Sequence, residues 1–192
     1  MNEMLDQAWD HIVARNEARI WSLATQGTDD WPTVRSVVLR SADRVAGTLE
    51  FHTDLRSPKV ADVQANPRAA ILCWLPEAVL QIRMQVNVRV DAGVDVQSKW
   101  DMVPIHARKA YGIMPASGTP IAMDRAYVTP ADRAQFAVLT CTALHIDLLS
   151  LGETHLRATY SRQSDWAGQW VAPLPTNRLY RSYEQYILAI DP

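Results

Sequence analysis

The chain is poor in the features that mark disulfide-rich and metal-binding proteins. It has two cysteines in 192 residues, Cys73 and Cys141, and both lie inside apolar runs. Their spacing fits neither a C-x-x-C motif nor a set of metal ligands. We therefore expect two buried, reduced thiols, no metal site and a cytoplasmic setting.

Long apolar runs and an excess of positive charge are also missing. No apolar run approaches the ~20 residues that span a bilayer, and the start of the chain, MNEMLDQAWDHI, is acidic and amphipathic, unlike a signal peptide. The 19 Lys and Arg against 21 Asp and Glu give a formal net charge of −2. Because nucleic-acid binding needs a basic surface, the composition predicts neither a nucleic-acid partner nor a membrane partner.

The common nucleotide-binding and hydrolytic motifs are absent from the sequence. There is no G-x-G-x-x-G after a first strand and no G-x-x-x-x-G-K-[ST], so the two most common nucleotide-binding folds are unsupported. There is no G-x-S-x-G or H-E-x-x-H either, which argues against a hydrolase. A cofactor, if bound, must be held in another way.

Short strand patterns fill most of the chain, and helical patterns lie only at its margins. The segment 80–90 alternates strictly between apolar and polar residues, which is typical of a strand with one buried face. Strands are also expected at 20–23, 33–39, 46–53, 68–74, 135–149, 154–160 and 168–174, and helices within 5–23, 58–65 and 97–111. This pattern predicts a mainly β fold, an antiparallel barrel with flanking α-helices.

Basic residues gather between positions 35 and 59 of this weakly acidic chain. Ser57 and Pro58 are expected to open a helix, because serine is a preferred N-cap and proline is tolerated at the first helical position. A lysine in the first turn, Lys59, is disfavoured by the helix dipole. A phosphate held by Ser57, the helix N–H groups and Lys59 would compensate. Taken alone, however, Lys59 is explained more simply as an exposed lysine at a small energetic cost.

Arg35 and Arg40 lie five residues apart and point to opposite faces of a regular strand. Both can reach one ligand only if the strand ends or bulges near Leu39. Arg35 is expected to be partly buried, where it would pair either with a phosphate or carboxylate or with Asp43 or Asp62.

The order of these motifs resembles the pyridoxamine 5′-phosphate oxidase family. The resemblance is carried by RSVVLR at 35–40, FHT at 51–53, LRSPK at 55–59, NPRAA at 66–70 and QIR at 81–83, and more weakly by 110–119 and 143–175. It implies a Greek-key split barrel and a homodimer with flavin mononucleotide (FMN) at the subunit interface. We expect an FMN-binding domain over 1–175, followed by a tail over 176–192 whose Tyr180, Tyr183 and Tyr186 pack at that interface.

The resemblance also implies a set of FMN contacts. Residues Arg35, Ser36, Val37, Val38, Leu39 and Arg40 would line the phosphate and ribityl chain. His52 and Thr53 would lie beside the flavin or ribityl. Ser57 and Lys59 would hold the phosphate, with Pro58 in the place of a family arginine and Arg56 as its substitute. Gln81, with Arg83 on the same face, would contact the ring edge, and Gly118 and Thr119 would reach across from the partner subunit.

Several positions depart from the pattern of the oxidases. Leu149 replaces a tryptophan that packs on the flavin, and Val86 replaces a glycine. The substrate-gripping Arg-x-His and a following FMN-binding arginine are here His155-Leu156-Arg157-Ala158-Thr159. These departures argue against oxidation of pyridoxamine 5′-phosphate, and they leave His155 and Arg157 as candidates to face a different substrate.

Two kinds of function remain open from the sequence. The first is an FMN-dependent oxidoreductase acting on an unidentified small molecule, or a reductase that uses a deazaflavin or nicotinamide partner. The second is a non-catalytic barrel that holds flavin or haem as a sensor, store or carrier. Haem would need a well-placed histidine, and none of His52, His106, His145 and His155 has a diagnostic setting.

Overall fold

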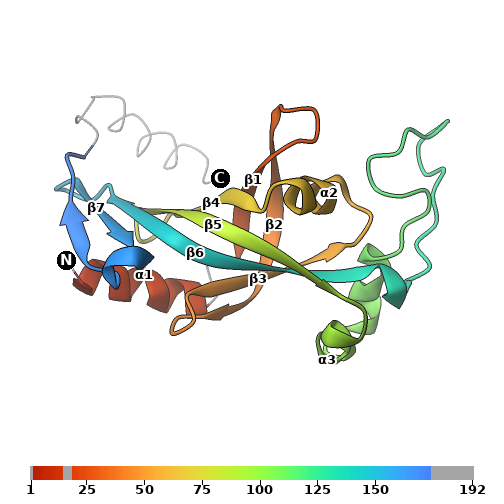
Figure 1. The fold of residues 1–192 in the computed structure, drawn as a ribbon, viewed down its shortest axis with the longest axis horizontal. Helices are drawn as coiled ribbons and strands as arrows, with labels where there is room; N and C mark the ends of the chain where they lie inside the picture. Colours follow the sequence, from red (N-terminus) through yellow and green to blue (C-terminus); the bar gives the residue numbers. More distant parts are fainter. Residues whose placement is uncertain (1, 15–18, 174–192) are drawn as a thin grey trace, which may run out of the picture.

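The computed structural model describes residues 2–14 and 19–173 (Figure 1). Its elements are α1 (Asn2–Ala14), β1 (Ile20–Gln26), β2 (Pro32–Asp43), β3 (Thr48–Asp54), α2 (Pro58–Ala65), β4 (Arg68–Leu75), β5 (Leu80–Ala92), η1 (Gly93–Val96), α3 (Gln97–Asp101), η2 (Ile105–Ala110), η3 (Arg133–Gln135), β6 (Phe136–Ser150), β7 (Leu156–Ser161), η4 (Arg162–Ser164) and β8 (Gly168–Trp170). The expected packing of the tail over 176–192 lies outside the described residues.

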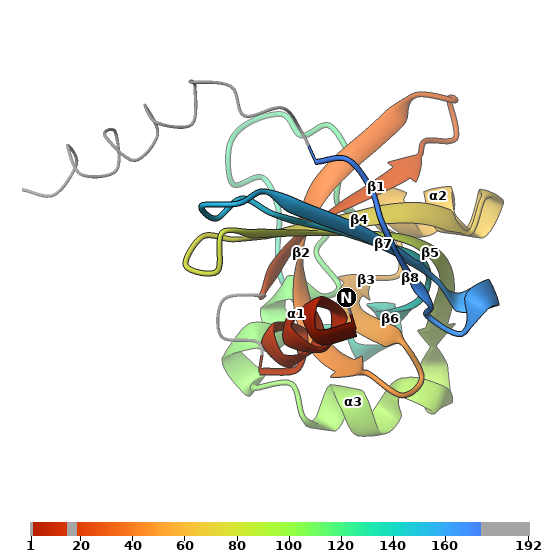
Figure 2. The ribbon, with the colours of Figure 1, turned by 90° about the vertical axis from the view of Figure 1, so that its left-hand side faces the viewer.

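The strands form one antiparallel sheet that closes on itself. Its order is β3-β2-β1-β4-β5-β6-β7-β8, and β3 also pairs with β6, so six strands make a barrel that β7 and β8 extend. In Figures 1 and 2, α1 and α3 lie below most of the strands and the short α2 lies above. Helix α1 packs its apolar face into the barrel core, and α2 contacts β1 and β5. The predicted fold, a mainly β antiparallel split barrel with flanking helices, is confirmed.

Apolar residues fill the barrel as the sequence patterns predict. On β5 the side chains of Leu80, Ile82 and Met84 are buried, whereas the alternate residues Arg83 and Gln85 are exposed. Helix α2 begins at Pro58 after Ser57 and buries Val60 and Val63 in the same core.

The structure refines the bounds of the predicted elements. The helical pattern over 5–23 that leads into a strand is α1, which ends at Ala14, followed by β1, which begins at Ile20. The helix over 97–111, expected to be broken or offset at Pro104, is α3 and η2, which lie on either side of that proline. Strand β8 is shorter than expected and ends at Trp170.

Among the described residues, no helix is both long and apolar enough to cross a membrane.

Candidate functional site

A buried carboxylate collects hydrogen bonds where β1, β2 and α2 meet. Oδ2 of Asp62 accepts from Oγ1 of Thr25 at 2.7 Å, from Oγ1 of Thr33 at 3.1 Å and from Nη2 of Arg35 at 3.1 Å. Arg35 also donates to the two threonine hydroxyls, at 2.6 and 2.7 Å. The interpretation of Arg35 as half of an ion pair with Asp62 is therefore correct. The same contacts fix the direction of its guanidinium.

A second polar group lies at the turn from β3 into α2. Nζ of Lys59 donates to Oγ1 of Thr53 at 3.1 Å, and the hydroxyls of Thr53 and Ser57 are 3.1 Å apart. Ser57 occupies the N-cap position of α2, yet its side chain makes no capping hydrogen bond. The Ser57 hydroxyl and the Lys59 ammonium thus converge at the start of the helix.

The two groups are electrostatically coupled. Burial lowers the pKa of Lys59, and the positive charge of Arg35 lowers it further, while Asp54 and Asp62 act in the opposite direction. Two neighbouring cations that are partly buried repel one another, and a bound anion relieves that repulsion. The positive charges of Lys59 and Arg35 and the uncapped Ser57 hydroxyl are groups of the kind that binds a phosphate.

Arg40 lies in different surroundings from Arg35. The pairing of β2 with β3 shifts between Leu39 and Ser41, which is the bulge needed if both arginines are to serve one ligand. Arg40 nevertheless contacts Tyr111 and lies near His52 rather than near Lys59. His52 in turn packs edge-on against Phe136, with ring centroids 4.9 Å apart. That Arg40 and His52 contact FMN remains a prediction.

We predict that His52 makes the stability of the protein depend on pH. Burial, and then the charges of Arg40 and Lys99, lower its pKa from 6.5 to about 4. Between these values the unfolded chain takes up a proton that the folded chain refuses, so the free energy of unfolding should fall as pH drops from about 6.5 to 4. Urea titrations across this range should show a shallower fall in His52→Asn than in wild type. Equal slopes would contradict the assignment.

The loop over 112–131 is tied to the start of α2. Oδ2 of Asp54 accepts from the backbone N–H of Gly112 at 2.7 Å, and Nη2 of Arg56 donates to Asp54 and to the carbonyl of Ile113. Burial raises the pKa of Asp54, but the hydrogen bonds from Arg56 and Gly112 outweigh it and lower that pKa overall. Arg56 is thus engaged in anchoring this loop.

Gly118 approaches the same helix start. It has φ +90°, and a Cβ placed on it would lie 3.2 Å from Cγ of Pro58. Glycine is needed there for both conformation and space. The loop that carries Gly118 and Thr119 therefore reaches the Ser57–Lys59 turn within one chain, and its predicted contact across a dimer stays a prediction.

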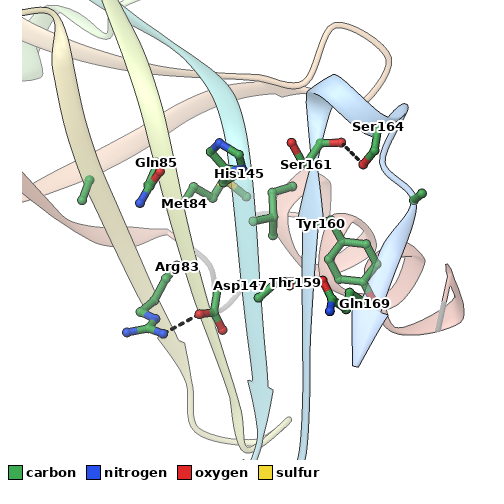
Figure 3. Close-up of a pocket in the computed structure, with 13 residues that line it drawn as sticks. Arg83, Met84, Gln85, His145, Asp147, Thr159, Tyr160, Ser161, Ser164 and Gln169 are labelled. Carbon is green, nitrogen blue, oxygen red and sulfur yellow. Dashed lines mark hydrogen bonds and ion pairs between the residues drawn. The ribbon is translucent and has the colours of Figure 1, made fainter. Parts of the chain in front are cut away.

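The other predicted residues lie on the outer face of β5, β6 and β7. Gln81 is opposite Leu149 in the sheet, and Leu149 is opposite Arg157. Asp147 bridges two arginines: Nε and Nη2 of Arg157 donate to it at 3.0 and 2.7 Å, and Arg83 donates to Oδ2. Figure 3 shows Arg83 and Asp147 side by side along one edge of a pocket of about 600 Å³.

The structure thus sorts the predicted site residues into separate groups. Thr53, Ser57 and Lys59 meet at the start of α2 with Pro58 and Gly118 beside them, and Arg35 is bonded to Asp62 on the same helix. Gln81, Arg83 and Arg157 share the outer face. The side chains of Val37 and Leu39 are buried in the core, so only the backbone of those residues is available to a ligand.

Sequence reasoning missed Asp54 and Asp147, the two acids that hold these groups in place. Asp54 stands two residues before Arg56, a spacing that could have indicated a local pair. Asp147 is opposite Arg83, which follows only once the register of β5 and β6 is known.

The sequence comparisons point to one family. Residues 1–91 match the family described as pyridoxamine 5′-phosphate oxidase, FMN-binding domain. The pyridoxine/pyridoxamine 5′-phosphate oxidase of Thermosynechococcus vestitus is 30% identical over 92 residues, covering 48% of this chain and 43% of that protein. The enzyme of the same name from Xylella fastidiosa (strain Temecula1) is 43% identical over 70 residues, covering 35% and 33%. The chain thus matches less than half the length of these relatives.

Solved structures extend the likeness over most of the chain. A pyridoxamine 5′-phosphate oxidase-related, FMN-binding protein from Nostoc punctiforme has a TM-score of 0.71 at 28% identity, covering 87% of this chain and 96% of that one. PhzG from Burkholderia lata, in complex with tetrahydrophenazine-1-carboxylic acid, has a TM-score of 0.67 at 19% identity, covering 90% and 92%. The second likeness shows the fold alone.

The fold is a split barrel like that of the Nostoc punctiforme protein. The resemblance to the pyridoxamine 5′-phosphate oxidase family is confirmed by the match of residues 1–91 and by the curated relatives of that name. The cofactor of the matched domain is FMN.

Proposed function

We propose that the chain is an FMN-dependent oxidoreductase that works as a homodimer on a small molecule other than pyridoxamine 5′-phosphate. One observation carries the cofactor part: the ammonium of Lys59 meets the Thr53 hydroxyl, which is bonded to that of Ser57, at the start of α2, and the charge of Arg35 acts on Lys59 from the Asp62 side of the same helix. We call these four residues the Lys59 cluster. This cluster would hold the FMN phosphate, with the bulged segment of β2 beside the ribityl chain.

The chemistry of such a protein comes from its flavin, which accepts and returns a hydride equivalent when bound. The residues of the chain need only hold the ring, admit a substrate to it and exclude competing groups. Gln81, whose amide can both donate and accept, suits the polar edge of the ring. Leu149, a buried and branched apolar residue opposite Gln81 in the sheet, takes the place of the tryptophan of the oxidases.

A second copy of the chain would complete the site. The outer faces of β1, β2 and β4 present exposed apolar side chains: Ile20 is 55% exposed, Val34 70% and Trp74 42%. The strand register places them on one side of the sheet, with Val38 opposite Ile20 and Ala24 opposite Val34. Apolar side chains gathered in this way are typical of a surface that binds another protein. The Nostoc likeness supports a common architecture over nearly the whole barrel.

The departures at Leu149 and Thr159 separate this chain from pyridoxamine 5′-phosphate oxidation. The alternative is a non-catalytic flavin carrier, and the test below distinguishes it from an oxidoreductase. The haem alternative finds no support at His52, which packs against Phe136 beside Arg40 and Lys99.

The proposal is tested by anaerobic reduction of the FMN-loaded dimer. We expect the flavin absorption to bleach on addition of NADPH, NADH or a reduced aromatic acid and to return on admission of oxygen. Pyridoxamine 5′-phosphate should bleach it no faster than buffer. Bleaching by dithionite alone, with no organic donor effective, would instead identify a flavin carrier.

A further inference from the structure

A polar pocket lies over β5, β6 and β7, away from the Lys59 cluster. Its volume is about 600 Å³, which is room for a small organic molecule. Figure 3 shows Arg83, Gln85, His145 and Asp147 along one side and Thr159 and Gln169 on the other. The pocket therefore has a charged end, formed by Arg83 and Asp147, and an uncharged end.

Arg157 does not itself line the pocket, but it is bonded to Asp147 and so adds a second positive charge beside the charged end. Burial raises the pKa of Asp147, but hydrogen bonds from Arg157 and Arg83 outweigh it and lower that pKa, so the carboxylate is ionised at neutral pH. Its single negative charge is shared by two guanidinium groups. Among the described residues that line the pocket, Asp147 is the only acid.

The two arginines remain open to a ligand. A guanidinium has more N–H groups than the bonds to Asp147 engage: one nitrogen of Arg83 and two of Arg157. Their side chains stay 44% and 27% exposed. Asp147 orients both guanidinium groups before a ligand arrives, and the N–H groups that it does not engage are donors of the kind that binds a carboxylate.

We propose that this pocket binds the carboxylate of a small organic acid, with Arg83 and Arg157 as the anion-binding residues and Asp147 as their positioning residue. One net positive charge matches one carboxylate. That this acid is the substrate rests on the proposed function, because Gln81 lies on the same strand face as Arg83, one residue pair away along β5.

The probes for the test are benzoate and its uncharged analogue benzamide, titrated calorimetrically into the FMN-loaded protein. We expect benzoate to bind at least about tenfold more tightly than benzamide. A tenfold difference in affinity is about 1.4 kcal/mol, which is close to the contribution of one hydrogen bond to a charged group. Arg157→Gln should remove this preference. Arg89→Gln is the matched control, because Arg89 lies on the same face of β5 but is 73% exposed and pairs with Asp91 outside the pocket.

Asp147→Asn separates a ligand site from a purely structural ion pair. If the arginines bind anions, Asp147→Asn should strengthen benzoate binding by about threefold or more, because the asparagine carbonyl oxygen can still accept from the arginines and orient them while the competing negative charge is gone. A structural pair predicts lower thermal stability with no gain in benzoate affinity. Thermal unfolding of each variant shows that it is folded at the temperature of the titration.

Four results would overturn the proposal: equal affinities for benzoate and benzamide, an unchanged preference in Arg157→Gln, no gain in benzoate affinity in Asp147→Asn, or release of FMN by benzoate. The last would assign the pocket to the flavin itself. If the protein holds no FMN at all, the proposed function fails, but the same titrations on the flavin-free chain still decide whether the pocket prefers a carboxylate.

Discussion

Replacing Lys59 by methionine and Arg35 by glutamine in one chain should weaken FMN binding by at least about 100-fold. Each hydrogen bond to a charged group contributes about 1.5–3 kcal/mol, and about 1.4 kcal/mol is a factor of ten in affinity. Lys59 donates to Thr53 at the position proposed for the phosphate, and the charge of Arg35 acts on Lys59 from the Asp62 side of α2. The measurement is quenching of FMN fluorescence on titration with the flavin-free protein.

Lys109→Met is the control for this double variant, since Lys109 is an exposed lysine in η2, far along the chain from α2. It should bind FMN as the wild type does. If the double variant still copurifies with one FMN per chain, the phosphate is held elsewhere, and Arg40 with its bulge becomes the first candidate.

Replacing Asp62 by alanine should lower the free energy of unfolding by about 2–4 kcal/mol. The change removes the acceptor for three donors and leaves Arg35 beside Lys59 without a counter-charge. Breaking a fully buried ion pair costs about 3–5 kcal/mol, and Arg35 is 22% exposed, which reduces the loss. Guanidinium chloride unfolding gives the value directly.

FMN should restore part of the stability lost in Asp62→Ala, because a phosphate between Arg35 and Lys59 supplies the missing negative charge. Asp124→Asn is the control, since this carboxylate is 93% exposed in a loop. A loss below about 1 kcal/mol in Asp62→Ala would show that the network contributes little to stability. An equal gain from FMN in the wild type and in Asp62→Ala would show that Arg35 does not meet the phosphate.

The sequence could predict the start of α2 and the strand β5 because both depend on local chemistry. Ser57 and Pro58 favour a helix start wherever they occur, and the alternation from Leu80 to Val90 requires one buried face. The Ser57–Lys59 part of the site followed from the same local argument.

Contacts that depend on register or on chain reversal could not be predicted in this way. Asp147 meets Arg83 because β5 and β6 pair in one particular register, and Gly112 meets Asp54 because a loop folds back 58 residues later. Arg35 shows a different limit. The sequence around Arg35 allowed either an ion pair with an aspartate or a bound anion. The structure shows the ion pair with Asp62, and the charge of Arg35 also lowers the pKa of Lys59.

The visible absorption spectrum of the freshly purified protein, followed by release of the chromophore by heat, tests the central claim most directly. The account predicts a flavin spectrum and FMN, rather than FAD or riboflavin, in the supernatant, because the Lys59 cluster requires a terminal phosphate. A colourless protein that also fails to take up added FMN would contradict it.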